Sequence, residues 1–305
     1  MKAGDEERGF NPLDSHRRYL AGFTLIELLV VISIISVLMA IGFPAFNKVR
    51  RQARAIVAAQ NQKEIITATS LFAMDNNERY PQSIATVGSG SDWNWSDPTK
   101  LINNSRRNPG VHRAMSEYLK SYITDARTMY CPNAPQRYKY LQQAWDAGDN
   151  WDYPEDDTFS TDPLGGTFCF YWNYVGYLGG SRVLFRGPQG PASGGRRFSK
   201  LLVTDYFGYD HWRSPWSFGS CEHFEGAKVN PETWLLSAYW CKEGDIENPP
   251  QIKMRAGYTD GHVETYSPSD TIPMKVSYTA DGTTPYPDGV GISPGIFFLP
   301  RNALQ

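Results

Sequence analysis

The residue with the clearest chemical requirement in this chain is Glu27. It is the only ionisable side chain in the 24 residues from Phe23 to Phe46, a run that is otherwise almost entirely apolar. A carboxylate placed in hydrocarbon costs on the order of 2–3 kcal/mol, so it marks a function and needs a partner. The position of a lone carboxylate in an apolar run therefore predicts that Glu27 pairs with a positive charge when the segment performs its function.

A second group of residues that could do chemistry lies further along the chain. Asp205, His223, Asp260 and His262 are types that bind metals or transfer protons, but such a site requires side chains that converge in space. The pair Asp260 and Gly261, followed by His262, instead has the pattern of a two-residue β-hairpin turn. We therefore predict a structural turn here, no catalytic residue and no enzyme.

The segment around Asp281 and Asp288 offers oxygen ligands of the kind that Ca²⁺ prefers. Its spacing does not match an EF-hand loop, and glycine and proline are frequent around both aspartates. We therefore predict an ordinary loop, with calcium as the alternative and no other cofactor.

The element that positions Glu27 is a long helix able to cross a membrane. At a rise of about 1.5 Å per residue, roughly 20 apolar residues span the ~30 Å core of a bilayer. Arg17 and Arg18 precede the run and should stay in the cytoplasm, so the residues beyond the helix are exported. A secretory signal fits less well, because its small residues follow the apolar core, whereas Ala21 and Gly22 precede it here.

The start of this helix resembles the N-terminal signature of the type IV prepilin family, which includes the pseudopilins of type II secretion. In that signature a glycine and a cleavage point precede Phe-Thr-Leu-Ile-Glu, as Gly22 precedes Phe23 to Glu27 here. Pro44 also lies where helices of this family often carry a proline. The resemblance covers about residues 17–75.

This resemblance implies processing followed by assembly. A prepilin peptidase would cut between Gly22 and Phe23, and the new amino group of Phe23 would be methylated. The mature subunit would join other pilin or pseudopilin subunits in a helical filament, with the help of an inner-membrane assembly platform. Glu27 would neutralise the amine of a neighbouring subunit, and Pro44, which removes a helix hydrogen bond, is assigned to assembly with it.

These features divide the chain into three parts. Residues 1–22 form a cleaved leader, residues 23–75 a transmembrane and assembly helix, and residues 76–305 an exported head. The net charge of the 305 residues is −2, which gives no support to nucleic-acid binding.

The second half of the helix carries an apolar stripe that we expect to pack against the head. Its members follow helical spacing: Phe46, Val49, Ala53, Ile56, Val57, Ala68, Leu71 and Phe72. Polar residues interrupt the stripe from Gln60 to Glu64.

The head has the pattern of an α+β domain, in which the stalk helix packs on an antiparallel β-sheet with long loops, as in pilins. Strands are expected at 166–177, 182–185, 200–206, 233–240, 252–258, 262–266 and 296–299, with short helices at 109–123 and 138–147.

The sequence from Asp260 to Val263 also resembles a C-terminal Asp-Gly-His-Val motif of a large pilin-like group in planctomycete-type bacteria. That group is named for a histidine that is separated from the Asp-Gly pair by nine intervening residues. Here this position is Pro250, and His223 resembles the displaced histidine.

Four cysteines lie in the exported part, which is an oxidising setting: Cys131, Cys169, Cys221 and Cys241. Three pairings are possible. We expect neighbours in sequence to pair, which gives Cys131–Cys169 and Cys221–Cys241.

Two functional hypotheses follow. The first is a structural subunit, a pseudopilin or minor pilin, held in the inner membrane by one helix with its head in the periplasm or at the cell surface. The alternative is a pilin-anchored binding module whose aromatic head adheres to glycan or protein. The tryptophans that would serve such a surface are Trp93, Trp95, Trp212 and Trp216.

Overall fold

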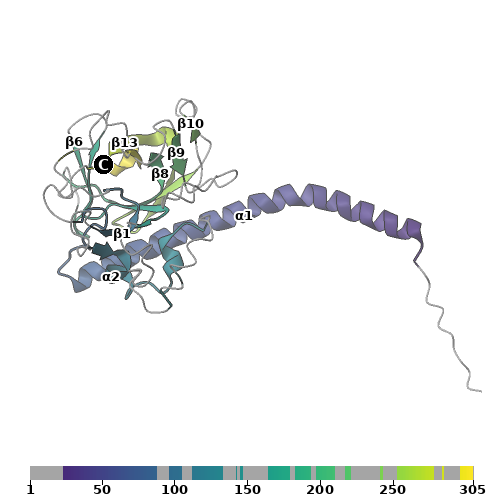
Figure 1. The fold of residues 1–305 in the computed structure, drawn as a ribbon, viewed down its shortest axis with the longest axis horizontal. Coiled ribbons are helices and arrows are strands. Elements are labelled where there is room, and N and C mark those ends of the chain that lie inside the picture. Colours follow the sequence, from purple (N-terminus) through teal and green to yellow (C-terminus); the bar gives the residue numbers. More distant parts are fainter. Residues whose placement is uncertain are drawn as a thin grey trace, which may run out of the picture. The chain divides into compact units, whose positions relative to one another are not determined.

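The protein is described by a computed structural model that covers residues 23–87, 96–104, 112–132, 142, 145–146, 164–178, 183–193, 197–209, 217–220, 241–242, 253–277, 284 and 296–304. The chain forms two compact units, residues 1–51 and residues 52–305. Helix α1 (Leu25–Asp75) begins in the first unit and ends in the second (Figure 1). The predicted long N-terminal helix is therefore confirmed.

The part of α1 from Leu25 to Phe46 exposes almost only hydrocarbon. Its apolar side chains are exposed, and α1 is long and apolar enough to cross a membrane. Ser33 donates its hydroxyl to the carbonyl of Val30 at 2.8 Å, and Ser36 donates to that of Ile32 at 2.7 Å. Because both hydroxyls are satisfied within the helix, they add little to the cost of placing this segment in lipid.

The second unit is built on antiparallel sheets (Figure 1). The largest has seven strands in the order β10 (Cys241–Lys242), β9 (Ser217–Ser220), β8 (Phe207–Tyr209), β14 (Ile296–Pro300), β13 (Thr271–Lys275), β5 (Val175–Leu178) and β6 (Val183–Arg186). A four-stranded sheet has the order β12 (Val263–Tyr266), β11 (Met254–Tyr258), β7 (Leu201–Asp205) and β4 (Phe168–Phe170). A three-stranded sheet joins β2 (His112–Ala114), β1 (Lys100–Asn104) and β3 (Leu164–Gly165).

These sheets and the long helix confirm the predicted α+β class. Most expected strands are present within one to three residues of their predicted ends, although the segment 166–177 contains two short strands, β4 and the start of β5.

The helix expected at 109–123 was largely wrong. Residues 112–114 form strand β2, whose Ala114 pairs with Ile102 of β1, and only Met115–Leu119 forms helix α2. The strand expected at 233–240 and most of the helix expected at 138–147 lie outside the described residues.

The face of α1 that packs in the second unit differs from the predicted stripe. The buried positions are Ala58, Gln62, Ile65, Ile66, Ala68, Thr69 and Ala73. Only Ala68 of the predicted stripe is fully buried, whereas Ile56 is 70% and Val57 48% exposed. Three alanines on the buried face let the helix approach the sheet closely, and Gln62 lies in the middle of this face.

The core of the second unit is rich in aromatic side chains. The largest fully buried residues include Trp172, Tyr171 and Tyr206. Tyr171 packs edge-to-face on Phe185 with ring centroids 5.5 Å apart, which is the arrangement that aromatic pairs prefer. Trp172 therefore belongs to the core. The four tryptophans assigned to a binding surface, at positions 93, 95, 212 and 216, lie outside the described residues.

Candidate assembly segment and stalk–head joint

The start of α1 is closed by a reciprocal pair of side chains, Thr24 and Glu27. The Glu27 carboxylate accepts from the Thr24 backbone N–H at 2.9 Å and from its hydroxyl at 2.8 Å. The Glu27 backbone N–H in turn donates to the Thr24 hydroxyl oxygen at 3.2 Å. This is a capping box, in which two otherwise unsatisfied N–H groups of the first helical turn gain partners.

The capping box fixes where the carboxylate lies. Its negative charge sits at the positive end of the helix dipole, next to Phe23, which is 77% exposed. A carboxylate has about four lone-pair sites, so these two bonds from Thr24 leave Glu27 able to accept from a further cation. Gly22 lies outside the described residues, and cleavage and methylation at Phe23 stay predictions.

Pro44 lies inside α1, which is continuous across it. A proline has no N–H to donate to the carbonyl four residues earlier, here that of Ala40. The helix is therefore weaker at this point although it is not broken. A role of Pro44 in assembly stays a prediction.

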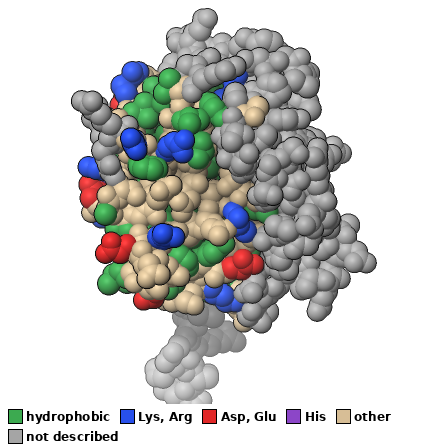
Figure 2. Space-filling model, turned by 90° about the vertical axis from the view of Figure 1, so that its left-hand side faces the viewer, with side chains coloured by type: hydrophobic (Ala, Val, Ile, Leu, Met, Phe, Trp, Pro, Cys, Tyr) green, Lys and Arg blue, Asp and Glu red, His purple; other side chains and the backbone are tan. Residues whose placement is uncertain are grey.

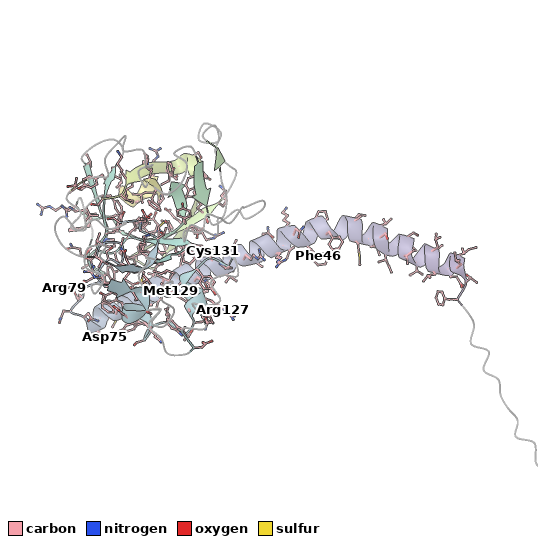
Figure 3. The ribbon with its side chains drawn as sticks, viewed as in Figure 1. Phe46, Asp75, Arg79, Arg127, Met129 and Cys131 are labelled. Carbon is pink, nitrogen blue, oxygen red and sulfur yellow. The ribbon has the colours of Figure 1, made fainter. Side chains whose placement is uncertain are left out.

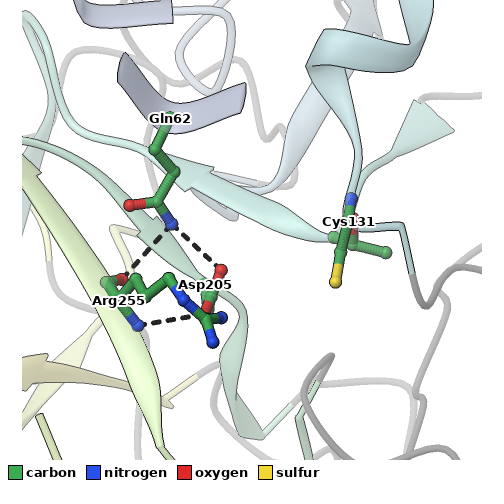
Figure 4. Close-up of polar contacts among 5 residues, drawn as sticks. Gln62, Cys131, Asp205 and Arg255 are labelled. Carbon is green, nitrogen blue, oxygen red and sulfur yellow. Dashed lines mark hydrogen bonds and ion pairs between the residues drawn. The ribbon is translucent and has the colours of Figure 1, made fainter. Parts of the chain in front are cut away.

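In the second unit, a buried polar cluster joins α1 to the four-stranded sheet. Gln62 of α1 donates from Nε2 to Oδ1 of Asp205 at 3.0 Å and to the backbone carbonyl of Arg255 at 3.4 Å (Figure 4). Asp205 ends strand β7, and Arg255 lies on the neighbouring strand β11. The helix is thus tied to two adjacent strands by one side chain, which we call the stalk–head joint.

The charges in this joint neutralise each other. The Arg255 guanidinium lies 3.1 Å from Oδ2 of Asp205, and the Arg255 backbone N–H donates to the same oxygen at 2.9 Å. The two side chains are only 7% and 0% exposed. A buried carboxylate is tolerated only when it is paired and hydrogen-bonded, and Asp205 meets this condition through Arg255 and Gln62.

A second set of contacts lies on the adjacent side of α1. Asn61 donates from Nδ2 to the backbone carbonyls of Arg127 and Tyr130 at 3.0 and 3.1 Å, and Thr128 donates to Glu64 at 2.9 Å. Figure 3 shows Arg127, Met129 and Cys131 beside this part of the helix. The polar residues that interrupt the predicted stripe are therefore the ones that hold α1 to the head.

Gly257 of β11 lies against the side chain of Ile66 on α1. A Cβ atom at this position would lie 2.6 Å from Cδ1 of Ile66 and 3.0 Å from Cγ1 of Val203. Such distances are too short for carbon atoms, so the side chains of Ile66 and Val203 would have to shift.

The predicted structural turn is a hairpin between β11 and β12, with one difference. The loop has three residues, 259–261, because the backbone N–H of Tyr258 donates to the carbonyl of His262 at 3.0 Å. Gly261 has φ +89, the left-handed conformation that the last residue of such a loop adopts. The loop is therefore one residue longer than the expected two-residue turn.

His262 and Asp260 interact within this turn. The backbone N–H of His262 donates to Oδ1 of Asp260 at 3.1 Å, and the His262 ring contacts the same oxygen and stacks on the Tyr258 ring. Desolvation is the largest single cause and raises the pKa of Asp260, but the bonds from His262 together outweigh it and hold the pKa below its usual range. Both side chains are more than half exposed. The arrangement stiffens a surface turn and includes no nucleophile.

The residues weighed as a catalytic or metal cluster do not converge in the described part of the chain. Asp205 contacts Arg255, whereas Asp260 lies in the hairpin turn beyond the end of the same strand, five residues after Arg255. No group of three or more potential ligands occurs among the described residues. His223, Asp281 and Asp288 lie outside them.

The expected Cys131–Cys169 disulfide is wrong. Both sulfurs are buried and they are not bonded to each other. Cys169 on β4 lies among the hydroxyls of Tyr171 and Thr204, and desolvation by burial raises the pKa of its thiol to about 12. The backbone N–H of Cys131 donates to the hydroxyl of Thr167 at 2.6 Å. Each cysteine therefore has its own packed environment. Cys221 and the side chain of Cys241 lie outside the described residues.

Three residues of these sites did not emerge from the sequence: Thr24, Gln62 and Arg255. Thr24 carried a readable signal, since Thr-x-x-Glu is the sequence pattern of a capping box. Gln62 was visible only as an interruption of the apolar stripe. Arg255 carried no local signal, because its partner Asp205 is 50 residues away in the chain.

The N-terminal part of the chain is similar to known proteins. Residues 17–43 match the protein family described as the prokaryotic N-terminal methylation motif. Two type IV major pilin proteins PilE1 of Neisseria gonorrhoeae are each 36% identical over 73 residues, which is 23% of this chain and 42% or 38% of those pilins. The type IV wide pilus major component PilA4 of Thermus thermophilus is 33% identical over 73 residues, which is 24% of this chain and 56% of PilA4.

The matches cover about half of these relatives or less, and no solved structure matches the chain. The methylation motif includes the apolar start of α1 and supports a pilin-like subunit with a membrane-anchoring N-terminal segment. The resemblance of the Asp260 turn to the planctomycete-type group stays a prediction.

Proposed function

We propose that this chain is a pilin-like structural subunit that is cleaved between Gly22 and Phe23, methylated on the new amino group, and assembled into a filament of the cell envelope. The observation that carries the proposal is the start of α1. A single carboxylate, held by Thr24, lies in the first turn of a helix long enough to cross a membrane, and the hydroxyls of Ser33 and Ser36 are satisfied within that helix.

The physical logic connects cleavage to assembly. Only cleavage creates a positive amine at Phe23, one turn from Glu27. In an apolar filament core, each amine needs a carboxylate, and Glu27 of a neighbouring subunit would supply it. The same contact repeated from subunit to subunit does not close on itself and gives an open helical polymer.

The experiment is mass spectrometry of the protein from membranes of cells that contain a prepilin peptidase. The expected mature terminus is N-methylated Phe23, and Gly22→Leu should leave the leader in place, because the resemblance implies a peptidase subsite too small for a larger side chain. A control substitution within the leader, Ser15→Ala, should be processed normally. An intact Met1 terminus in the wild-type protein contradicts the proposal.

The filament is proposed to be either a type II secretion pseudopilus or a type IV pilus, with this chain as a pseudopilin or minor pilin. The similarity to two type IV pilin groups supports the general class. Co-purification separates the two machines, since a pseudopilin should bring down secretion components and a minor pilin the major pilin.

A further inference from the structure

The edge strand β6 borders an open groove on the head. β6 pairs with β5 and forms one end of the seven-stranded sheet. The groove has a volume of about 510 Å³, and the described residues that line it are Leu184, Arg186, Arg197 and Phe198. Figure 2 shows lysine and arginine side chains beside hydrophobic ones on the side of the head where Figure 1 places β6.

The backbone of β6 is directed toward this groove at Leu184. The Arg186 carbonyl accepts from the Ser199 N–H at 2.8 Å, so it points away from β5, whereas the Gly187 N–H points toward β5 and donates to Tyr174 at 2.9 Å. Backbone groups of alternate strand residues point to the same side, so those of Leu184 also point away from β5. The edge is therefore already occupied at Arg186 by Ser199, and within β6 the backbone groups that face the same side are those of Leu184.

The side chains of the groove define the chemistry of that chain. Arg186 and Arg197 are exposed, and in the described part of the protein neither guanidinium forms an ion pair or a side-chain hydrogen bond. Apolar surface lies beside them, with Val183 57% and Leu184 37% exposed. An extended segment with carboxylates and an apolar side chain complements this surface.

The chain itself contains such a segment. The 40 residues from 142 to 181 include seven acidic residues and no lysine or arginine. Within them, residues 155–162 read Glu-Asp-Asp-Thr-Phe-Ser-Thr-Asp, with Asp157 and Phe159 two residues apart and therefore on the same side of an extended chain.

We propose that the β6 groove binds the acidic segment 155–162 of a second copy of this chain. The carboxylates of the segment meet Arg186 and Arg197, and Phe159 covers Leu184 and Phe198. The contact is heterologous, since the groove of one copy takes the segment of the next, and it can repeat along a polymer. The inference rests on the proposed filament function, which brings many copies of the head together.

The first test measures self-association of the full chain in detergent by light scattering over a range of protein concentrations. The wild-type protein should associate at low salt and dissociate as salt rises, because screening weakens exposed charge pairs. Arg186→Glu with Arg197→Glu should raise the dissociation constant by about tenfold or more. Arg79→Glu makes the same change at an exposed arginine outside the groove and should have little effect.

A charge swap identifies the occupant. Asp156→Arg with Asp157→Arg should weaken association as the groove variant does, and the combined four-residue variant should restore it. Mixing the groove variant with the segment variant should give heterodimers, since one intact groove and one intact segment remain. A monomer at every concentration, unchanged affinity of either variant, or failure of both the swap and the mixture overturns the inference.

The inference and the proposed function fail in different ways. An uncleaved leader contradicts the filament function, while association of the purified full chain still tests the groove. Conversely, normal processing and filament incorporation of the groove variant, together with unchanged association in detergent, contradict the groove and leave the filament function standing.

Discussion

The Glu27 carboxylate accepts two hydrogen bonds from Thr24, so the residue predicted to neutralise a neighbour's amine also caps its own helix. Neutralising an amine requires a negatively charged side chain, whereas capping the helix requires only a hydrogen-bond acceptor. A neutral amide can still accept from Thr24, but it cannot neutralise a buried ammonium group.

The first prediction separates these roles of Glu27. Glu27→Gln and Glu27→Ala should both be processed and both enter filaments poorly, because stranding a buried charge costs about 3–5 kcal/mol. Loss of the cap alone costs about 0.5–2 kcal/mol, so it is the smaller effect. Quantitative immunoblotting of sheared filaments against total membranes measures incorporation. Wild-type incorporation of Glu27→Gln together with failure of Glu27→Ala would show that capping is the essential role.

The second prediction concerns the stalk–head joint. Asp205→Ala should lower the free energy of unfolding of the head by about 3–5 kcal/mol, since it leaves the Arg255 charge buried without its carboxylate. Gln62→Ala should cost less, about 1–3 kcal/mol, because it removes a neutral donor from the cluster. Urea unfolding followed by tryptophan fluorescence measures both. As a control, Lys63→Ala changes the exposed residue next to Gln62 and should be nearly neutral; equal costs for all three variants would refute the account.

The third prediction compares two glycines. Gly261→Val should cost about 1–2 kcal/mol or more through backbone strain alone, because φ is +89 and no atom lies within 4 Å of a Cβ there. Gly257→Ala should cost about 1–3 kcal/mol through overlap with Ile66.

A double-mutant cycle distinguishes these causes. Ile66→Val removes the Cδ1 atom that a Cβ at position 257 would meet, so it should recover part of the loss in Gly257→Ala and none in Gly261→Val. Urea midpoints measure all variants. Equal recovery at the two positions would disprove the steric explanation.

His262→Ala should leave filament incorporation nearly intact, since its ring contacts lie within an exposed turn.

The fourth prediction is a loss of stability in alkali. Desolvation raises the pKa of the Cys169 thiol and of the Tyr80 hydroxyl to about 12 each, and the pKa of buried Tyr171 and Tyr174 is raised well above its usual value. In the unfolded chain these groups release protons near pH 8.5 to 10. The unfolded state therefore binds fewer protons than the folded state above about pH 9, and stability falls as pH rises toward 12.

Urea midpoints measured from pH 7 to 11 test this dependence. The free energy of unfolding should be flat near neutrality as far as these groups contribute, and it should fall above about pH 9. Tyr174→Phe removes one buried hydroxyl that titrates and should reduce the slope in alkali. An unchanged midpoint up to pH 11 would contradict the burial of these groups.

Local sequence patterns predicted the features that depend on near neighbours. The membrane-length helix was predicted from an apolar run and the β11–β12 hairpin from an Asp-Gly pair. The cap at Thr24 was not predicted, although Thr-x-x-Glu is an equally local signal that spans three residues. Strands β4 to β7, β11, β12 and β14 were also predicted, since alternation and aromatic content act over short windows, whereas β1, β2, β8, β9 and β13 were not.

The tertiary structure decided which face of α1 is buried and what the cysteines contact. The apolar stripe predicted that Ile56 and Val57 would be buried, yet Gln62 faces the sheet instead. Its partner Asp205 lies 143 residues later in the chain, so no local pattern could indicate this contact. The expected Cys131–Cys169 bridge failed for a related reason: sequence proximity does not place two sulfurs within bonding distance. Contacts of this range are set by how helix and sheets pack together, and no local pattern of residue types specifies that packing.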